Sequence, residues 1–159
     1  MNDGVLRSKI RRMLEAHATA TLATAGPGGP WAAAVFYASD EQLNLYFVSD
    51  GGTRHGTDML GHGRVAAAIH ADVDNWNDVR GLQVEGDAQP VPDARRGAAL
   101  DIYLRKFPDV ARLRDAPRDE NERLIGQRLA RIALWRLSPH RIRIIDNRES
   151  FGWKQELVL

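Results

Sequence analysis

The first hydrophobic pattern in the chain is helical. From Leu6 to Leu14, apolar residues recur every three or four positions, and lysines and arginines occupy the positions between them. This spacing places the apolar side chains on one face of a helix, and Asn2 or Asp3 is suited to cap its start. We therefore predict a helix over residues 5–17.

Beyond this helix the pattern changes to short apolar runs separated by turn residues, which predicts a mainly β protein. The segment 26–30, GPGGP, is the clearest turn. Because consecutive runs are joined by such tight connections, we expect a mainly antiparallel sheet, and closing it into a barrel would remove its exposed edges. The predicted strands cover residues 18–25, 31–38, 43–48, 64–71, 80–91, 129–137 and 141–146.

A second helical region interrupts these strands. Asp93 is a suitable cap for a helix over residues 94–106, which Pro108 is expected to end. The charged stretch that follows favours helical or irregular structure, so we expect a helical insertion over about residues 93–128. The length of 159 residues predicts a single domain, residues 1–159.

One predicted strand has no polar face. Residues 31–38, WAAAVFYA, form a continuous apolar run, which is typical of a strand that is covered on both sides. In an antiparallel protein this cover needs either a second layer or a partner subunit. The three consecutive alanines leave room for a planar ring against the backbone, or alternatively allow close packing in a barrel core or at a dimer contact.

Composition narrows the functional classes. The net charge is +1 and acidic residues are interleaved with the arginines, so we expect no nucleic-acid partner. No apolar run approaches the roughly 20 residues of a membrane span, and the N-terminal segment lacks the apolar core of a signal peptide. We therefore expect a cytoplasmic protein with no membrane partner. The absence of cysteine excludes disulfides, thiolate metal sites and cysteine nucleophiles.

The segment from Ser49 to Gly63, SDGGTRHGTDMLGHG, combines the features of an anion site. Two glycines, a threonine, an arginine and a histidine precede a short helical pattern. A helix start offers free backbone N–H groups and the positive end of the helix dipole, and hydroxyls and a guanidinium add donors that suit phosphate oxygens. The alternative is a polar loop in which Thr53 only caps the helix.

Other chemistry has no clear signature in the sequence. The histidines form no HExxH pattern and no i, i+4 pair, so we expect no metal site, and no GxSxG segment indicates a serine nucleophile. The five histidines are His17, His55, His62, His70 and His140. A phosphate-bearing ligand at residues 49–63 is therefore the remaining hypothesis.

Several motifs, taken in order, resemble the pyridoxamine-phosphate-oxidase-like, FMN-binding split-barrel superfamily over nearly the whole chain. They are ATATLATAGPGGP, WAAAVFYASDEQ, LNLYFVS, GGTRHG and the final hairpin WRLSPHRIRIID. The segments TRHG, RGLQVEG and DNRESFGWK are similar to a small, poorly characterised bacterial branch of that superfamily. The resemblance implies an antiparallel split β-barrel of about six or seven strands with flanking helices, and a homodimer with two flavin sites between its subunits.

Carried over by position, the resemblance implies two groups of FMN-binding residues. The first group would hold the phosphate and consists of Ser49, Thr53, Arg54 and His55. The second would line the flavin ring, largely through its backbone, and consists of Ala33, Ala34, Val35 and Phe36. Trp76 or Trp153 is a candidate to cover the ring from the partner subunit, on its aromatic character alone.

The chain also departs from the oxidase pattern. His55 stands where the oxidases usually carry lysine, Ala38 replaces a second lysine, and Gly81 replaces a flavin-contacting glutamine. The Arg-x-His-x-Arg pattern that holds the substrate phosphate is absent near the C-terminus. We therefore expect an FMN-dependent oxidoreductase or reductase on an unknown small molecule, not a true pyridoxamine phosphate oxidase. The alternatives are a non-catalytic flavin- or haem-binding protein, with His17 or His70 as iron ligand, and a structural dimer with a decayed cofactor site.

Overall fold

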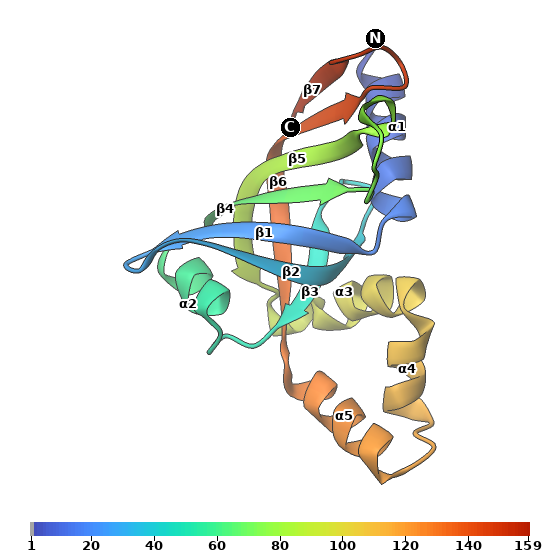
Figure 1. Ribbon diagram of the computed structural model, residues 1–159. Coiled ribbons are helices and arrows are strands. Elements are labelled where there is room, and N and C mark those ends of the chain that lie inside the picture. Colours follow the sequence, from blue (N-terminus) through green and yellow to red (C-terminus); the bar gives the residue numbers. More distant parts are fainter. Residues whose placement is uncertain (1) are drawn as a thin grey trace.

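Seven strands form one antiparallel sheet in the computed structural model, which describes residues 2–159 (Figure 1). They are β1 Thr19–Gly26, β2 Gly29–Ser39, β3 Leu45–Ser49, β4 Arg64–His70, β5 Arg80–Pro90, β6 Ala133–Asp146 and β7 Lys154–Val158. Their order is β3-β2-β1-β4-β5-β6-β7, and an additional pairing of β3 with β6 closes the first six into a barrel. The predicted antiparallel barrel with flanking helices is confirmed.

Two helices lie at opposite ends of the barrel (Figure 1). The first, α1 Asp3–Ala16, is capped by the Asn2 side chain, which accepts a hydrogen bond from the Val5 N–H group, so the predicted N-terminal helix is confirmed. The second, α2 Arg54–Gly61, packs against β1 and β2 and buries Met59 in the barrel core. No helix within residues 2–159 is both long and apolar enough to cross a membrane.

The barrel core follows from the two-residue period of its strands. Along β1 and β4 every second side chain is buried, and the residues between them are exposed. Trp135 and Phe47 stack in this core with their ring centroids 6.5 Å apart. The Trp135 Nε1–H group donates a hydrogen bond to the Ser49 carbonyl at 3.1 Å, which fixes the end of β3, where the predicted phosphate segment begins.

The helical insertion between β5 and β6 contains three helices. They are α3 Asp93–Lys106, α4 Pro108–Asp115 and α5 Glu120–Arg131. Helix α3 covers the outer face of β2, β3 and β6, where it packs against Ala38, Tyr46 and Leu134. Helices α4 and α5 form a hairpin that projects beyond the barrel (Figure 1).

Two details of the insertion correct the sequence prediction. Asp93 is not the cap of α3, because Pro92 occupies the cap position and no side chain accepts a hydrogen bond there. Helix α5 continues through Arg131, although the apolar residues from 129 onward predicted a strand. In a short apolar run, the spacing of the apolar residues does not distinguish the end of a helix from the start of a strand.

The strand β6 also differs from its prediction. It runs without interruption from Ala133 to Asp146, although two separate strands, 129–137 and 141–146, were predicted on either side of Ser138-Pro139. A bulge between Glu85 and Gly86 of the neighbouring strand β5 shifts the register beside Pro139. A Cβ atom at Gly86 would lie 2.3 Å from the Ser138 carbonyl oxygen, so this close approach requires glycine.

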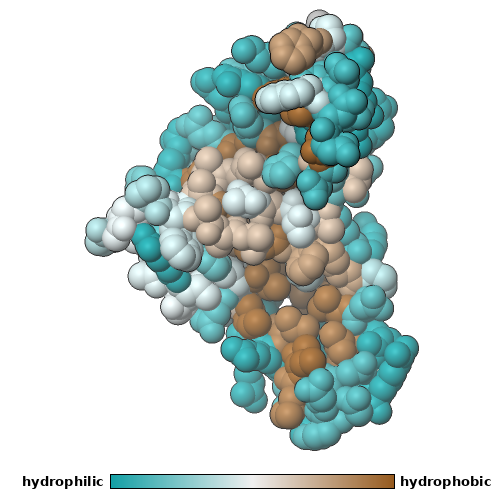
Figure 2. All heavy atoms as spheres, in the orientation of Figure 1, coloured by the Kyte–Doolittle hydropathy of each residue, from teal (hydrophilic) through white to brown (hydrophobic). Residues whose placement is uncertain are grey.

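The outer face of β1, β2 and β4 is uncovered. We call it the open sheet face, and its exposed residues are Thr19, Thr21, Ala23, Ala25, Pro30, Ala32, Ala34, Phe36, Arg64, Ala66, Ala68 and His70. The prediction that strand 31–38 is covered on both sides is therefore wrong within a single chain, except at Ala38 beneath α3. Figure 2 shows this region as a pale, weakly apolar surface across the middle of the molecule.

Candidate functional site

The loop between β3 and α2 brings together three of the residues predicted to hold a phosphate. Ser49 Oγ lies 2.6 Å from His55 Nε2, and Thr53 Oγ1 lies 3.3 Å from the same nitrogen. Ser49 is the last residue of β3, and Thr53 is the cap of α2. The strand end and the helix start therefore place two hydroxyls around one imidazole.

Backbone groups at the start of α2 supply further donors. The first helical hydrogen bond runs from the Thr57 N–H group to the Thr53 carbonyl at 2.8 Å, and the Thr53 hydroxyl accepts from the Gly56 N–H group at 3.1 Å. The N–H groups of Arg54 and His55 precede these bonds and are free in the way that helix starts provide. The Thr53 hydroxyl also donates to the Asp50 carbonyl at 2.7 Å, so an anion would rely mainly on the two N–H groups and Ser49.

The charge of this site depends on His55. Burial lowers the His55 pKa below its ordinary value of 6.5, and the nearby Asp58 carboxylate opposes that shift more weakly. The imidazole is therefore neutral at neutral pH. A neutral imidazole still donates one hydrogen bond, but it adds no positive charge where a lysine would add one.

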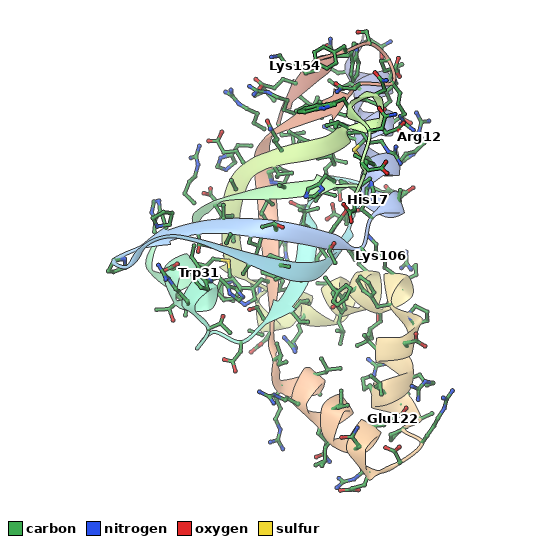
Figure 3. All side chains as sticks on the ribbon, in the orientation of Figure 1. Arg12, His17, Trp31, Lys106, Glu122 and Lys154 are labelled. Atoms are coloured by element: carbon green, nitrogen blue, oxygen red, sulfur yellow. The ribbon has the colours of Figure 1, made fainter. Side chains whose placement is uncertain are left out.

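The Arg54 side chain points away from Ser49, Thr53 and His55, toward the β1–β2 hairpin. Its Nη2 donates to the Gly28 carbonyl at 2.7 Å, and its guanidinium carbon lies 4.4 Å from the centroid of the Trp31 ring. Both partners belong to the β1–β2 hairpin beside α2, where Figure 3 places Trp31. The structure therefore brings Ser49, Thr53 and His55 together and holds Arg54 at the neighbouring hairpin.

A buried carboxylate fixes α2 against β1. Asp58 is 6% exposed and accepts a hydrogen bond from Thr24 Oγ1 at 2.9 Å. A Cβ atom added at Gly26 would lie 1.9 Å from Asp58 Oδ1, so only glycine leaves room for this carboxylate. Sequence reasoning missed these supporting residues, and the only available signal was that the inward positions of β1 include a threonine.

The four residues predicted to line the ring divide between the two faces of β2. Ala34 and Phe36 are on the open sheet face, and Phe36 is 58% exposed. Ala33 and Val35 point toward the barrel, so only their backbone groups are available on the outside. Phe36 meets Phe107 edge to face at 5.6 Å, which places an aromatic wall at the end of this surface.

Cationic groups gather at the other end of β1, far from Trp31 (Figure 3). Lys106 Nζ donates to the carbonyls of Leu14 and His17 at 2.9 and 2.6 Å and thereby joins α3 to the end of α1. Burial lowers the His17 pKa, and the charges of Arg80, Lys106 and His70 lower it further. The two candidate iron ligands, His17 and His70, therefore lie within electrostatic reach of each other.

The two tryptophans proposed for the partner's ring differ in exposure. Trp76 is 77% exposed on the loop before β5, whereas Trp153 is half-buried against the barrel core beneath Lys9. Their role toward a partner subunit stays a prediction. Within residues 2–159, no three histidine, aspartate or glutamate side chains are placed to hold a metal ion together.

The donor set at α2 suits a phosphate group. It combines free N–H groups, a serine hydroxyl and an imidazole, with the Arg54 guanidinium one hairpin away. The nearest carboxylates are already engaged, Asp50 with the Gly52 N–H group and Asp58 with Thr24. These hydrogen bonds fix where the two carboxylates point, but both keep their negative charge, so Arg54 and the helix start have to offset their repulsion of an anion.

A closed six-stranded barrel with a donor-rich helix start at one end defines a split-barrel protein. The chain belongs to the pyridoxamine 5'-phosphate oxidase family, whose model matches residues 6–136. It is 29% identical over 146 residues to a UPF0306 protein of Yersinia pseudotuberculosis, covering 91% of this chain and 88% of the relative. This relative agrees with the bacterial branch that the motifs indicated.

Solved structures share the fold at low sequence identity. A haem-binding protein from Mycobacterium smegmatis superposes with a TM-score of 0.70 at 18% identity, over 96% of this chain and 57% of that one. ChuZ from Campylobacter jejuni superposes with a TM-score of 0.74 at 12% identity, over 99% of this chain and 61% of that one. At these identities the likeness concerns the fold alone.

Proposed function

We propose that the protein binds FMN and acts as an FMN-dependent oxidoreductase or reductase on a small molecule. The observation that carries this proposal is the group of donors at the start of α2, where Ser49 and Thr53 surround His55 beside two free N–H groups. This group lies next to the end of the barrel at which the open sheet face begins. Membership of the pyridoxamine 5'-phosphate oxidase family supports flavin as the ligand.

Each part of the site has a separate task in this proposal. Ser49, His55 and the first-turn N–H groups of α2 hold the phosphate, and Arg54 joins them by exchanging the Gly28 carbonyl for a phosphate oxygen. Ala34 and Phe36 present a flat apolar surface to the ring, with backbone contacts from Ala33 and Val35. When bound, the flavin supplies the redox chemistry, and the protein orients it.

The proposal includes a homodimer, because the open sheet face lacks cover in one chain. It also includes a cytoplasmic location. It excludes true pyridoxamine phosphate oxidase activity, because Ala38 offers no cation and is 1% exposed beneath α3. Gly81 likewise has no side chain for a flavin contact. The substrate is therefore expected to differ from that of the oxidases.

An absorption spectrum of the purified protein tests the flavin proposal. We expect bands at about 370 and 450 nm, and quenching of FMN fluorescence when the apoprotein is titrated with FMN. Bleaching of the bound flavin by NADH or NADPH, followed by reoxidation with turnover, would support an enzyme over a carrier. A colourless protein that quenches no FMN fluorescence would exclude flavin binding and leave a structural dimer with a decayed site.

Haem binding is the second candidate, and one observation favours it. His17 and His70 lie within electrostatic reach at the cationic end of β1, and a haem-binding protein shares the fold. Imidazole is a common axial ligand of haem iron, and nearby cations suit propionate groups. A Soret band after addition of haem, lost in His17→Ala or His70→Ala but kept in His62→Ala, would assign this function.

A further inference from the structure

A second cleft lies between α1 and the ends of β5 and β6, at the end of the barrel opposite to α2. It encloses about 420 Å³, which is within the range of roughly 300–1,000 Å³ that is typical of small-molecule sites. We call it the α1 cleft. Its charged side chains are four cations and two carboxylates, from Lys9, Arg12, Arg80, Arg148, Asp146 and Glu149.

Both carboxylates of the α1 cleft are paired with cations of the same cleft. Asp146 is 8% exposed and accepts two hydrogen bonds from the Arg148 guanidinium, at 2.9 and 2.7 Å. Glu149 forms an ion pair with Lys9 of α1. These two pairs neutralise four of the six charges and hold the turn after β6 against α1.

Arg12 and Arg80 carry the charges that remain. Arg12 belongs to α1, and Arg80 is the first residue of β5, opposite Asp146 in the strand pairing. In the part of the chain that the structure describes, residues 2–159, neither guanidinium forms an ion pair or a hydrogen bond. Solvent satisfies most surface arginines, but Arg80 is half-buried, and a charge that loses water favours an ionic partner. The cleft therefore keeps two positive charges that the chain does not neutralise.

The surroundings of His17 also indicate a positive potential in the α1 cleft. Burial lowers the His17 pKa, and the charge of Arg80 is the next largest cause. The last carbonyls of α1 would oppose an anion, because the C-terminal end of a helix carries a negative partial charge. Lys106 offsets this effect, since its Nζ donates to the carbonyls of Leu14 and His17. Figure 3 shows Arg12 and His17 on α1, far from Trp31.

The α1 cleft also has an apolar part and room for more than one anionic group. Met13, which is 9% exposed, and Ala16 line it beside the charged side chains. A bare phosphate, at a few times the roughly 30 Å³ of a water molecule, would leave much of the cleft unfilled. Because the two unpaired guanidiniums come from different elements, each can bind a separate carboxylate through parallel hydrogen bonds.

We propose that the α1 cleft binds a small molecule with two anionic groups on a short apolar body, such as an aliphatic dicarboxylate. Arg12 and Arg80 each hold one carboxylate, and Met13 and Ala16 contact the carbon atoms between them. His17 donates one further hydrogen bond in its neutral form. The site lies at the opposite end of the barrel from the donors of α2, so it is independent of the flavin in the proposed function.

Isothermal titration calorimetry of the full chain with succinate tests this site. Butyrate is the matched ligand, because it has a carbon chain of the same length and only one carboxylate. At equal ionic strength we expect succinate to bind about ten-fold more tightly than butyrate, and Arg12→Ala or Arg80→Ala to weaken succinate binding about ten-fold. Arg7→Ala is the matched control, since it removes the same charge from an exposed position of α1 that does not line the cleft, and it should keep wild-type affinity.

Two further variants locate the bound anion. Arg54→Ala should keep the affinity for succinate, and a loss there would move the anion to the start of α2 and overturn the proposal. His17→Ala removes an iron ligand of the haem candidate but leaves both guanidiniums, so it should keep most of the affinity for succinate. Complete loss of binding in His17→Ala would overturn the assignment to Arg12 and Arg80.

The same titrations contain the results that would refute the α1 cleft as a dicarboxylate site. Equal affinities for succinate and butyrate, or unchanged succinate affinity in both Arg12→Ala and Arg80→Ala, would overturn it. Circular dichroism should show wild-type secondary structure in each variant, because all the substituted side chains are exposed or half-buried. A colourless protein that binds succinate would overturn the proposed flavin and leave this site intact.

Discussion

His55 determines how much positive charge the start of α2 offers to a phosphate. Its imidazole is bonded to Ser49 and is partly buried, which keeps its pKa low in the free protein. A bound phosphate would stabilise the protonated ring and raise that pKa. Ligand binding and proton uptake at His55 are therefore expected to be linked.

This linkage predicts a pH dependence of FMN affinity. Because binding raises the His55 pKa, affinity should be higher at low pH and should fall as pH rises through the lowered pKa of the free imidazole toward the higher pKa of the bound one. We expect a loss of about five-fold, the difference between a charged and a neutral hydrogen bond. Fluorescence titration of FMN measures it, with His55→Gln as the control whose affinity should stay flat over this range. An equal slope in that control would place the titrating group elsewhere.

Arg54 is a permanent cation in the first turn of the same helix. Arg54→Ala should weaken FMN binding by about 1.5–3 kcal/mol if the guanidinium leaves the Gly28 carbonyl for the phosphate. Arg54→Lys should recover part of the loss, because lysine keeps the charge without the bidentate geometry. Unchanged affinity in the alanine variant would show that Arg54 serves only the β1–β2 hairpin and Trp31.

Gly26 is expected to be a stability position. Gly26→Ala should lower the free energy of unfolding by about 1–3 kcal/mol, because the new methyl group would meet the Asp58 carboxylate and displace it from Thr24. Gly61→Ala is the matched control at the end of α2, where nothing lies within 4 Å of the added atom. Urea unfolding measures both variants, and equal stabilities would refute the steric argument.

Among the elements, the α4–α5 hairpin depends on few contacts with the barrel. Arg112 of α4 makes a two-pronged hydrogen bond with Glu122 of α5, at 2.6 and 3.0 Å. The Arg118 N–H group donates to the same carboxylate at 2.7 Å. This one glutamate therefore connects both helices with the loop between them.

The lowered pKa of Glu122 predicts how the α4–α5 hairpin responds to acid. Its hydrogen bonds with Arg112 and Arg118 lower the Glu122 pKa to about 2 from its ordinary value of 4.5. The contribution of this carboxylate is present above pH 4.5 and is lost as pH falls toward 2. Glu122→Gln should accelerate hydrogen exchange of α5 at neutral pH, while Glu120→Gln, which affects only the Arg123 pair, should change it less. Equal exchange in the two variants would contradict this role.

The success of the sequence prediction differs from element to element. The strands β1 and β2 were predictable because the glycines and prolines of residues 26–30 mark the turn between them. The boundary between α5 and β6 was not predictable, because residues 129–137 are mostly apolar and fit both a helix end and a strand. The continuity of β6 through Pro139 depends on a bulge in β5, which no local pattern reveals.

The candidate site was predictable only in part, for a reason that concerns the whole molecule. Ser49, Thr53 and His55 are close in sequence, and a strand end followed by a helix start necessarily brings them together. Arg54 points instead to Gly28, a partner 26 positions away that only the barrel places beside it. The contact between Thr24 and Asp58 depends in the same way on tertiary packing.

At the scale of the whole molecule, the two ends of the barrel offer different chemistry. The α2 end presents hydroxyls, N–H groups and Arg54, and the α1 end presents His17, Lys106 and Arg80. The open sheet face lies between these ends and ends in the aromatic wall of Phe36 and Phe107. A ligand with one anionic end and a planar body matches the first arrangement, and a second copy of the chain would enclose it.

The pairing of β3 with β6 has a consequence for how the chain folds. It joins Leu45 to Leu137 and Ser49 to Ala133, so the barrel closes only after the whole insertion has been brought back. Contacts between such distant residues form slowly, and we expect this seam to be the last part of the barrel to gain protection during refolding. The closure entropy grows by only about 0.6 kcal/mol for each doubling of the loop. The insertion is therefore the segment in which length can change during evolution while the barrel keeps its fold.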